Sequence, residues 1–444
     1  MTKKSSIIKY IFVCIAVALG IFLSVCSFAI PFTTVNFNGF ANSIPLGLDV
    51  AGGYSAVYDI VLEDDSKSLD EEIDSSVQFI SDVLARQGYT DAIVTKQGDN
   101  QIRLTVSKNN NSELLISTLG SAGDIRIKSS ETTDESDSDI IGEDISNVYA
   151  TRLQTSETEF SWGVMIEFTQ TSSTGKSGAE KYEELTSTVS SSGNTIYIYM
   201  DDELYQSIGG ISEAQTNGVL FLSGGGITTQ ETANQFALRV LVGTLETKLS
   251  QAPNSVIEIP ATLGGNFMIF GCVALAILAI IFVVLMVIKF KDFGWLSLLS
   301  LLIYVILVVF FMQAIPLVLL TLGGFIALAL GLALLLISHA IMFNNISKEY
   351  SYGKKIHLSV KAGYKKSILP IVDINVVAII ASFVMWFLGD VFTMSFGIIL
   401  TISCAIGMFT SLLVTRAFMK WYLPINSSNA KKLGFKRGEN VNEI

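Results

Sequence analysis

Three polar side chains that could take part in a proton-transfer site, two of them titratable, lie within apolar stretches of the chain. His339 lies in one stretch, and Asp373 and Asn375 lie in the next. Asp373 is the only acidic residue clearly inside an apolar run, so we expect its carboxylate to be buried and either protonated or paired. His339 is a candidate partner, because a neutral imidazole and a carboxylate can exchange a proton at moderate pH. The same side chains could instead hydrogen-bond neighbouring helices or satisfy backbone groups freed by Pro370, and the sequence leaves both roles open.

The chain has few residues that could support hydrolytic catalysis, metal binding or disulfide bonds. The chain has only two histidines, His339 and His357, and its four cysteines all lie in apolar runs, at Cys14, Cys26, Cys272 and Cys404. A Ser-His-Asp triad, a zinc site or a disulfide framework outside those runs is therefore not expected. We predict no enzymatic activity, no metal and no cofactor.

Two segments resemble phosphate-binding loops only superficially. Gly175-Lys176-Ser177 looks like the end of a Walker loop, but Gln170 stands where its first glycine belongs. Gly224-Gly225-Gly226 has no Lys-Ser/Thr after it, so we predict a turn before a capped helix that begins near Thr228. Any use of ATP would then belong to a partner.

Membrane helices must position His339, Asp373 and Asn375. Half of the residues are hydrophobic, only 16% are charged and the mean hydropathy is +0.52, which is typical of an integral membrane protein. A bilayer core needs about 20 apolar residues per helix. Six runs of that kind occur, at about 7–30, 266–288, 294–314, 316–343, 367–388 and 391–419.

The charges divide the chain into two regions of opposite sign. Residues 31–265 hold 34 Asp and Glu against 12 Lys and Arg, whereas the rest of the chain holds 17 Lys and Arg against 6 acidic residues. All 17 bases fall at helix ends or loops that share one side. The positive-inside rule predicts that this side is the cytoplasm of a cell-membrane protein, with both termini inside and residues 31–265 outside.

We therefore expect four parts. Residues 1–30 form an uncleaved N-terminal anchor helix, because the apolar stretch is longer than a signal peptide needs and no clean cleavage site follows. Residues 31–265 form an extracytoplasmic α+β domain, residues 266–423 form a five-helix bundle, and residues 424–444 form a cytoplasmic tail.

The extracytoplasmic domain shows repeated changes of hydrophobic period. Strands near 53–63, 92–96, 102–106 and 124–128 and helices near 70–84 and 112–119 give the order β-α-β-β-α-β, which predicts a ferredoxin-like unit. Mixed α/β patterning then repeats to residue 241. Between the two halves, Glu131–Asp144 holds seven acidic residues among fourteen, and we predict a solvated linker because the spacing does not fit a calcium loop.

One motif resembles a known family. Pro45-Leu46-Gly47-Leu48-Asp49-Val50-Ala51-Gly52-Gly53 is similar to the L-G-L-D-L-x-G-G segment that opens the ectodomain of SecD proteins, and Gly47, Asp49, Gly52 and Gly53 keep its pattern. Thr262-Leu263-Gly264 resembles the T-L-G that precedes the second helix of the family. Most of the chain can be matched in this way.

The resemblance is incomplete inside the membrane. In the fourth helix the family's proton-linked Asp falls on Ile337, its Asn on His339, and its Glu-Arg pair on Asn344 and Asn345. In the fifth helix Asp373 and Asn375 keep the Asp and Asn of the family's D-A-N-x-T-T, but both threonines are lost. The resemblance thus leaves open whether His339 with Asp373 or a SecF partner supplies the missing groups, or whether the chain is a scaffold without coupling.

The resemblance implies an accessory subunit of Sec protein export. Its partners would be a SecF-like subunit, the Sec channel, an unfolded secretory polypeptide and membrane lipid, with no nucleic acid. Two alternatives remain open from the architecture. A permease-like subunit of an ATP-driven transporter usually has three helices after the ectodomain rather than five, and a stand-alone proton-driven efflux protein normally duplicates the bundle within one chain.

Overall fold

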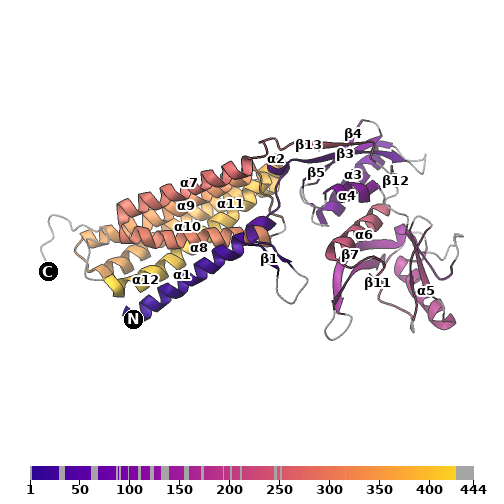
Figure 1. Ribbon diagram of the computed structural model, residues 1–444, viewed down its shortest axis with the longest axis horizontal. Coiled ribbons are helices and arrows are strands. Elements are labelled where there is room, and N and C mark those ends of the chain that lie inside the picture. The colour runs from indigo at the N-terminus through magenta and orange to yellow at the C-terminus, as the bar shows by residue number, and fades with distance from the viewer. Residues whose placement is uncertain are drawn as a thin grey trace. The chain divides into compact units, whose positions relative to one another are not determined.

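The structure is a computed structural model of the chain, and it divides into two compact units, Met1–Ala51 with Ala261–Ile444 and Gly52–Pro260 (Figure 1). The chain therefore passes between the units twice, at Ala51–Gly52 and at Pro260–Ala261. The structure describes residues 3–29, 36–61, 69–86, 89, 92–98, 100–108, 112–120, 125–131, 140–154, 160–171, 175–193, 195–200, 203–210, 213–244, 248–250, 253–315 and 317–426.

The first unit is a bundle in which six helices of the described chain are long and apolar enough to cross a membrane. This confirms the predicted number of spans. The helices are α1 (Lys3–Val25), α7 (Phe267–Phe290), α8 (Asp292–Ala314), α9 (Leu322–Ser351), α10 (Ile356–Leu388) and α11 (Val391–Phe409), the last of which continues through a π-helical turn, η3 (Thr410–Val414), into α12 (Thr415–Asn426).

The helix bounds differ from the apolar runs at several ends. Helix α10 begins at Ile356, eleven residues before the start of its predicted run at 367. Helix α9 begins at Leu322, six residues after the start of its predicted run at 316. Hydropathy marks only the part of a helix that can face lipid. Helical hydrogen bonding in α10 continues beyond that part, into the lysine-rich turns at its start.

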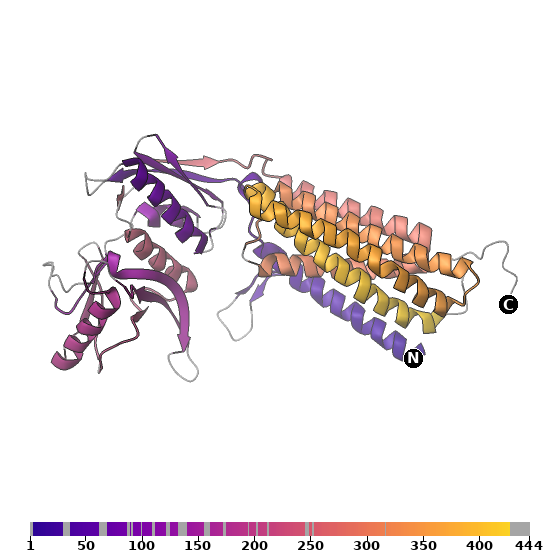
Figure 2. The same cartoon turned by 180° about the vertical axis from the view of Figure 1, so that it is seen from behind.

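Helix α9 is the centre of the bundle and contacts α7, α10 and α11. Glycines allow close crossings there, because a Cβ on Gly363 would lie 2.5 Å from the backbone nitrogen of Ile346, and one on Gly397 would lie 2.5 Å from the carbonyl oxygen of Ser382. Helix α1 lies along α8 and α12, as both views show (Figure 2). The start of α1 is fixed to α12 by a 2.6 Å hydrogen bond from the Tyr10 hydroxyl to the carbonyl of Phe418.

Four short elements after α1 belong to the same unit. They are β1 (Phe28–Ala29), which pairs with β2 (Asn36–Phe37), the 3-10 turn η1 (Phe40–Ser43), and the single helical turn α2 (Leu48–Ala51). The motif around Gly47 and Asp49 therefore folds with the bundle.

The second unit contains a five-stranded antiparallel sheet. Its elements are β3 (Gly53–Val61), α3 (Leu69–Arg86), β4 (Ile93–Gln97), β5 (Gln101–Ser107), α4 (Ser112–Gly120), β12 (Lys248–Leu249) and β13 (Ser255–Ile259). The strand order is β12-β3-β5-β4, and β13 also pairs with β3. This is the order of a ferredoxin-like unit whose last strand comes from the far end of the domain.

The predicted last strand of that unit was wrong. Strand β6 (Ile125–Lys128) forms, but it pairs with β9 (Ile196–Met200) in another sheet. Both edges of β3 are already occupied, one by β5 and the other by β12 and β13. The alternation of apolar residues predicts a strand but not its partner, and β13 lies about 200 residues after β3.

The remainder of the second unit forms two three-stranded sheets. Their orders are β10-β9-β6 and β11-β8-β7, built from η2 (Gly142–Asp144), β7 (Ile145–Gln154), β8 (Phe160–Phe168), α5 (Gly178–Ser192), β10 (Glu203–Ile208), β11 (Val219–Ser223) and α6 (Gln230–Gly243). One apolar core is shared by this part and the ferredoxin-like part. The triple glycine is a turn with φ values of 83°, 56° and 94°, and Thr229 caps α6, as predicted.

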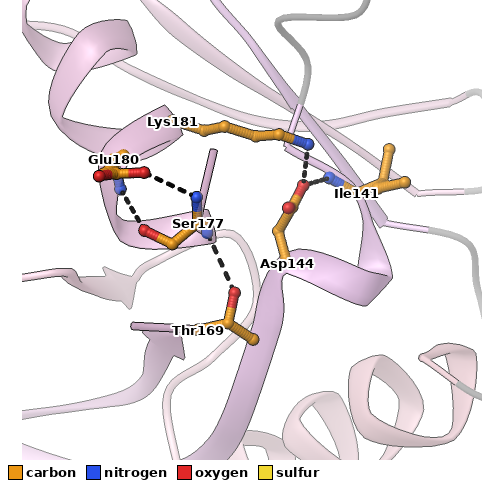
Figure 3. A network of polar contacts seen from close by, with 7 residues as sticks. Ile141, Asp144, Thr169, Ser177, Glu180 and Lys181 are labelled. Carbon is orange, nitrogen blue, oxygen red and sulfur yellow. Dashed lines mark hydrogen bonds and ion pairs between the residues drawn. The ribbon is translucent and has the colours of Figure 1, made fainter. Parts of the chain in front are cut away.

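The end of the acidic segment is a structural junction (Figure 3). Residues 132–139 of the predicted linker lie outside the described residues, but Asp144 is buried, and its carboxylate accepts from Lys181 Nζ at 2.9 Å and from the Ile141 amide at 3.0 Å. Ser177 of the Walker-like triplet caps α5, since its hydroxyl accepts from the Glu180 amide at 3.3 Å. The hydroxyl thus has a capping role.

A substitution at Gly178 tests whether the close packing at this junction stabilises the second unit. A Cβ at Gly178 would lie 2.1 Å from the Asp144 carbonyl oxygen, so Gly178→Ala is expected to cost about 1–3 kcal/mol of stability through overpacking. Thermal unfolding of the full chain, followed by protease resistance of the second unit, measures the loss. The matched control is Gly175→Ala, where a Cβ meets nothing within 4 Å. Equal melting of the two variants would contradict this account.

Candidate functional site

The family-like motif binds the start of the central membrane helix. Leu46 forms a parallel bridge with Leu320, with the Leu320 amide donating to the Pro45 carbonyl at 2.8 Å and the Gly47 amide donating to the Leu320 carbonyl at 3.1 Å. Gly47 is required here, because a Cβ would lie 2.6 Å from Thr321 Cγ2. The segment before β3 is therefore held against the loop that leads into α9.

Asp49 caps α9 from outside the helix. Its Oδ2 accepts from the amide of Leu322, the first residue of α9, at 2.6 Å, and Thr321 accepts from the Gly324 amide at 3.2 Å. A carboxylate at a helix N-terminus satisfies a free amide and complements the helix dipole. The Asp49 carbonyl also accepts from the Leu263 amide at 3.2 Å, so the motif joins α9 to the segment that leads into α7.

The last two motif glycines allow the chain to leave the bundle. Gly52 has a φ of 71°, in the left-handed region that favours glycine, and its carbonyl accepts from the Lys108 amide at 2.8 Å. Gly53 begins β3 and pairs with both Ser107 and Ile259. Gly52 and Gly53 thus have backbone roles at the start of the second unit.

His339 is fully buried inside the bundle and lies between the rings of Phe282 and Phe343. Its Nδ1 is 3.0 Å from the Leu335 carbonyl, and its Nε2 is 2.8 Å from Thr415 Oγ1. Thr415 Oγ1 is in turn 2.8 Å from Ser300 Oγ. A chain of hydrogen bonds therefore joins α9, α12 and α8.

This chain can satisfy either protonation state of the imidazole. A carbonyl only accepts, so Nδ1 carries a proton, and in the neutral ring Nε2 accepts from the Thr415 hydroxyl. In the charged ring Nε2 donates to Thr415, which can then donate to the Thr410 carbonyl at 3.0 Å. That carbonyl is the first of the π-helical turn, a form often found at functional sites.

Asn375 lies in a second polar cluster. It is buried, its Nδ2 donates to the Ile371 carbonyl at 2.7 Å, and Ser338 Oγ lies 3.4 Å from that nitrogen. Two further buried hydroxyls, of Tyr304 and Ser403, make no hydrogen bond within the described part of the chain. A Cβ on Gly331 would lie 2.7 Å from the Tyr304 hydroxyl oxygen and 3.1 Å from Ser403 Oγ. The middle of the bundle thus holds polar groups from four helices.

The expectation that Asp373 is buried was wrong. Its side chain is exposed on α10, and the described hydrogen bonds of His339 go to Leu335 and Thr415 rather than to Asp373. Ile337, which takes the position of the family's Asp, is 40% exposed. Apolar residues lie on all sides of α10 around Asp373, so the sequence there indicates depth in the membrane but not which face turns inward.

The sequence alone did not predict a role for Ser300, Thr415 or Tyr304. Ser and Thr are common in membrane helices, and only contacts between helices distant in sequence distinguish these residues. Among the described residues there is no group of three or more His, Cys, Asp or Glu side chains that could hold a metal ion.

Comparisons with known proteins agree on one family, although no family model matches the chain. The protein translocase subunit SecD of Sebaldella termitidis is 26% identical over 396 residues, 89% of this chain and 93% of the relative. The SecD subunit of Acidaminococcus fermentans is 25% identical over 84% of this chain and 85% of the relative.

Solved structures share the fold. A crystal structure of SecDF in its super-membrane-facing form matches 96% of this chain with a TM-score of 0.61 at 20% identity. SecDF from Thermus thermophilus matches 94% of the chain with a TM-score of 0.50 at 19% identity. The chain spans 59% of the length of each of these two SecDF chains.

The cap by Asp49 can be tested. Asp49→Ala leaves the Leu322 amide without its acceptor and is expected to lower bundle stability by about 1–2 kcal/mol. A thiol-reactive dye in a thermal ramp measures this loss in a chain whose Cys14, Cys26 and Cys272 are replaced by Ala, since the remaining Cys404 is buried and reacts only when the bundle opens. Asp49→Asn keeps an oxygen acceptor and should lose less. Identical melting of the alanine variant and the unmodified chain would exclude a stabilising cap.

Proposed function

The chain belongs to the SecD family, and on that premise we propose that it is an accessory subunit of Sec protein export. The observation that carries the proposal is the match to SecD subunits over most of both chains. A match over 89% of the chain includes residues of both compact units. In this role the chain assists the movement of unfolded polypeptides across the membrane.

We further propose the orientation that the charges predict. The chain is a multi-pass membrane protein, and the ends of its spans that carry Lys9, Lys289, Lys348 and Arg416 share one side. Clustering of bases at these ends favours the cytoplasm for that side, in the cell membrane. The second unit would then meet the translocating polypeptide as it leaves the Sec channel.

A SecF-like subunit is the proposed partner of the bundle. Asp373 is exposed on α10, and so are Val376, Val377 and Ile380, three, four and seven residues further along the same helix face. Carboxylates within membrane helices almost always face a bundle interior or a water-filled cavity. A related second half packed on this face would give Asp373 such surroundings.

Asp373 is the proposed site of proton coupling, with Asn375 and His339 behind it in the bundle. The carboxylate lies on the face offered to the partner, where a change in its charge would alter the pairing of the two halves. The His339–Thr415–Ser300 chain has acceptors for both states of the imidazole. It could therefore follow a change of protonation without leaving a donor unpaired.

The export role is tested by purifying the tagged full chain from its own membranes in mild detergent. We expect a SecF-like subunit and the Sec channel to be recovered with it, because both are proposed to contact the chain. A soluble export subunit or an unrelated membrane protein, tagged in the same way, is the control for non-specific recovery. Recovery of an ATPase in place of the Sec components would contradict the export role.

Proton coupling is tested by Asp373→Asn. The amide keeps the shape of the carboxylate but cannot lose a proton, so export of a reporter is expected to fall to the level of cells that lack the chain. Ile337→Val is the matched control, because it changes an exposed position on α9, the helix packed against α10, without changing charge. Unaltered export in the Asp373→Asn cells, at equal protein level, would rule out coupling through this carboxylate.

A further inference from the structure

A groove with a volume of about 450 Å³ lies between α10 and α12 at the base-rich end of the bundle. Five of its lining residues can carry positive charge, namely His357, Lys361, Lys365, Arg416 and Lys420. All five side chains are exposed. Among the described residues, the lining contains no Asp or Glu.

These cationic residues recur at regular spacing on the two helices that border the groove. His357, Lys361 and Lys365 are four residues apart on α10, and Arg416 and Lys420 are four apart on α12. Residues at that spacing lie above one another on one face of a helix. The groove is therefore bordered by a row of positive charge on each side.

The floor of the groove is apolar and closed. Val360, Tyr364, Met419 and Leu423 are buried there, and Ile368 extends the lining from the charged end toward the apolar part of α10. The groove thus combines a cationic rim with an apolar base that continues in the direction of the membrane core. Such a combination suits a molecule with an anionic head and an apolar tail.

Arg416 is held in position before any ligand binds. Its guanidinium lies over the ring of Tyr364, with 4.4 Å between the guanidinium carbon and the ring centroid. Tyr364 is itself fixed, since its hydroxyl donates to the Leu412 carbonyl at 3.1 Å. A stacked arginine keeps its N–H groups available in a planar fork that matches a phosphate.

The positive-inside rule explains why bases lie at this end but not why these bases gather around one groove. Two neighbouring lysines at the same end are neutralised within the chain, because Lys354 and Lys366 both form ion pairs with the buried carboxylate of Glu349. No ion pair to Lys361, Lys365, Arg416 or Lys420 occurs among the described residues. Their charge remains available to an external anion.

We propose that this groove binds an anionic phospholipid. The phosphodiester lies against Arg416 with Lys420, Lys361 and Lys365 around it, and an acyl chain lies along the apolar floor. Basic pockets between membrane helices on the cytoplasmic side commonly bind such headgroups. A lipid, rather than a soluble acidic polypeptide, fits best because the apolar floor continues toward the bilayer. The site would fix the position of α12 against α10 in a membrane rich in anionic lipid.

Native mass spectrometry of the full chain tests the proposal. The protein is titrated with phosphatidylglycerol or with phosphatidylcholine of the same acyl chains. We expect retention of phosphatidylglycerol, and Arg416→Gln/Lys420→Gln should weaken it about 30-fold, because each direct charged contact with the phosphate contributes about fivefold to the affinity. Lys361→Gln/Lys365→Gln should act in the same direction from the other side of the groove.

The matched control is Lys289→Gln/Lys348→Gln, which removes two exposed bases from the same end of the bundle but outside the groove. Its affinity should stay within about twofold, since general attraction alone is then changed. Equal weakening by groove and control variants would overturn the site, and so would equal retention of phosphatidylcholine. Displacement of the lipid by an equal concentration of inorganic phosphate would assign the groove to a free anion and overturn the lipid proposal. A monodisperse gel-filtration peak for each variant establishes that it is folded.

Discussion

The hydrocarbon of a membrane offers no hydrogen bonds, and this constraint explains the positions of key polar groups in the bundle. The free amide of Leu322 at the start of α9 is satisfied by Asp49, from a segment more than 270 residues earlier. His339 is satisfied at both nitrogens, by Leu335 and by Thr415. The motif before the second unit is therefore as much a part of the membrane fold as the helices are.

Asp373 does not obey that constraint within this chain. Its side chain is exposed on an apolar helix, and the SecF-like partner proposed above would remove this conflict by covering that face. The basic groove at Arg416 is also charged and exposed, and the anionic phospholipid proposed for it would neutralise that charge at the membrane surface. These two exposed features are the basis of the two proposals, a protein partner within the membrane and a lipid at its edge.

The sequence predicted what depends on local composition. Six apolar runs gave six helices, and alternating apolar residues gave β3, β4, β5 and β6 near their observed bounds. It failed where the answer depends on long-range pairing or on orientation. Strand β13 takes the edge of β3 assigned to β6, and Asp373 turns outward on a helix that is apolar all round. The Thr415–Ser300 contact was missed because single hydroxyls in apolar helices carry no signal of their partner.

The most direct test of the account is a photo-crosslinker at Val377, one helical turn from Asp373 on the exposed face of α10. In native membranes the account predicts a single cross-linked product that contains a SecF-like subunit. A crosslinker at Ile8, on the exposed face of α1, should not give that product. Capture of lipid alone at Val377, in membranes where export is active, would contradict the claim that a second transporter half covers Asp373.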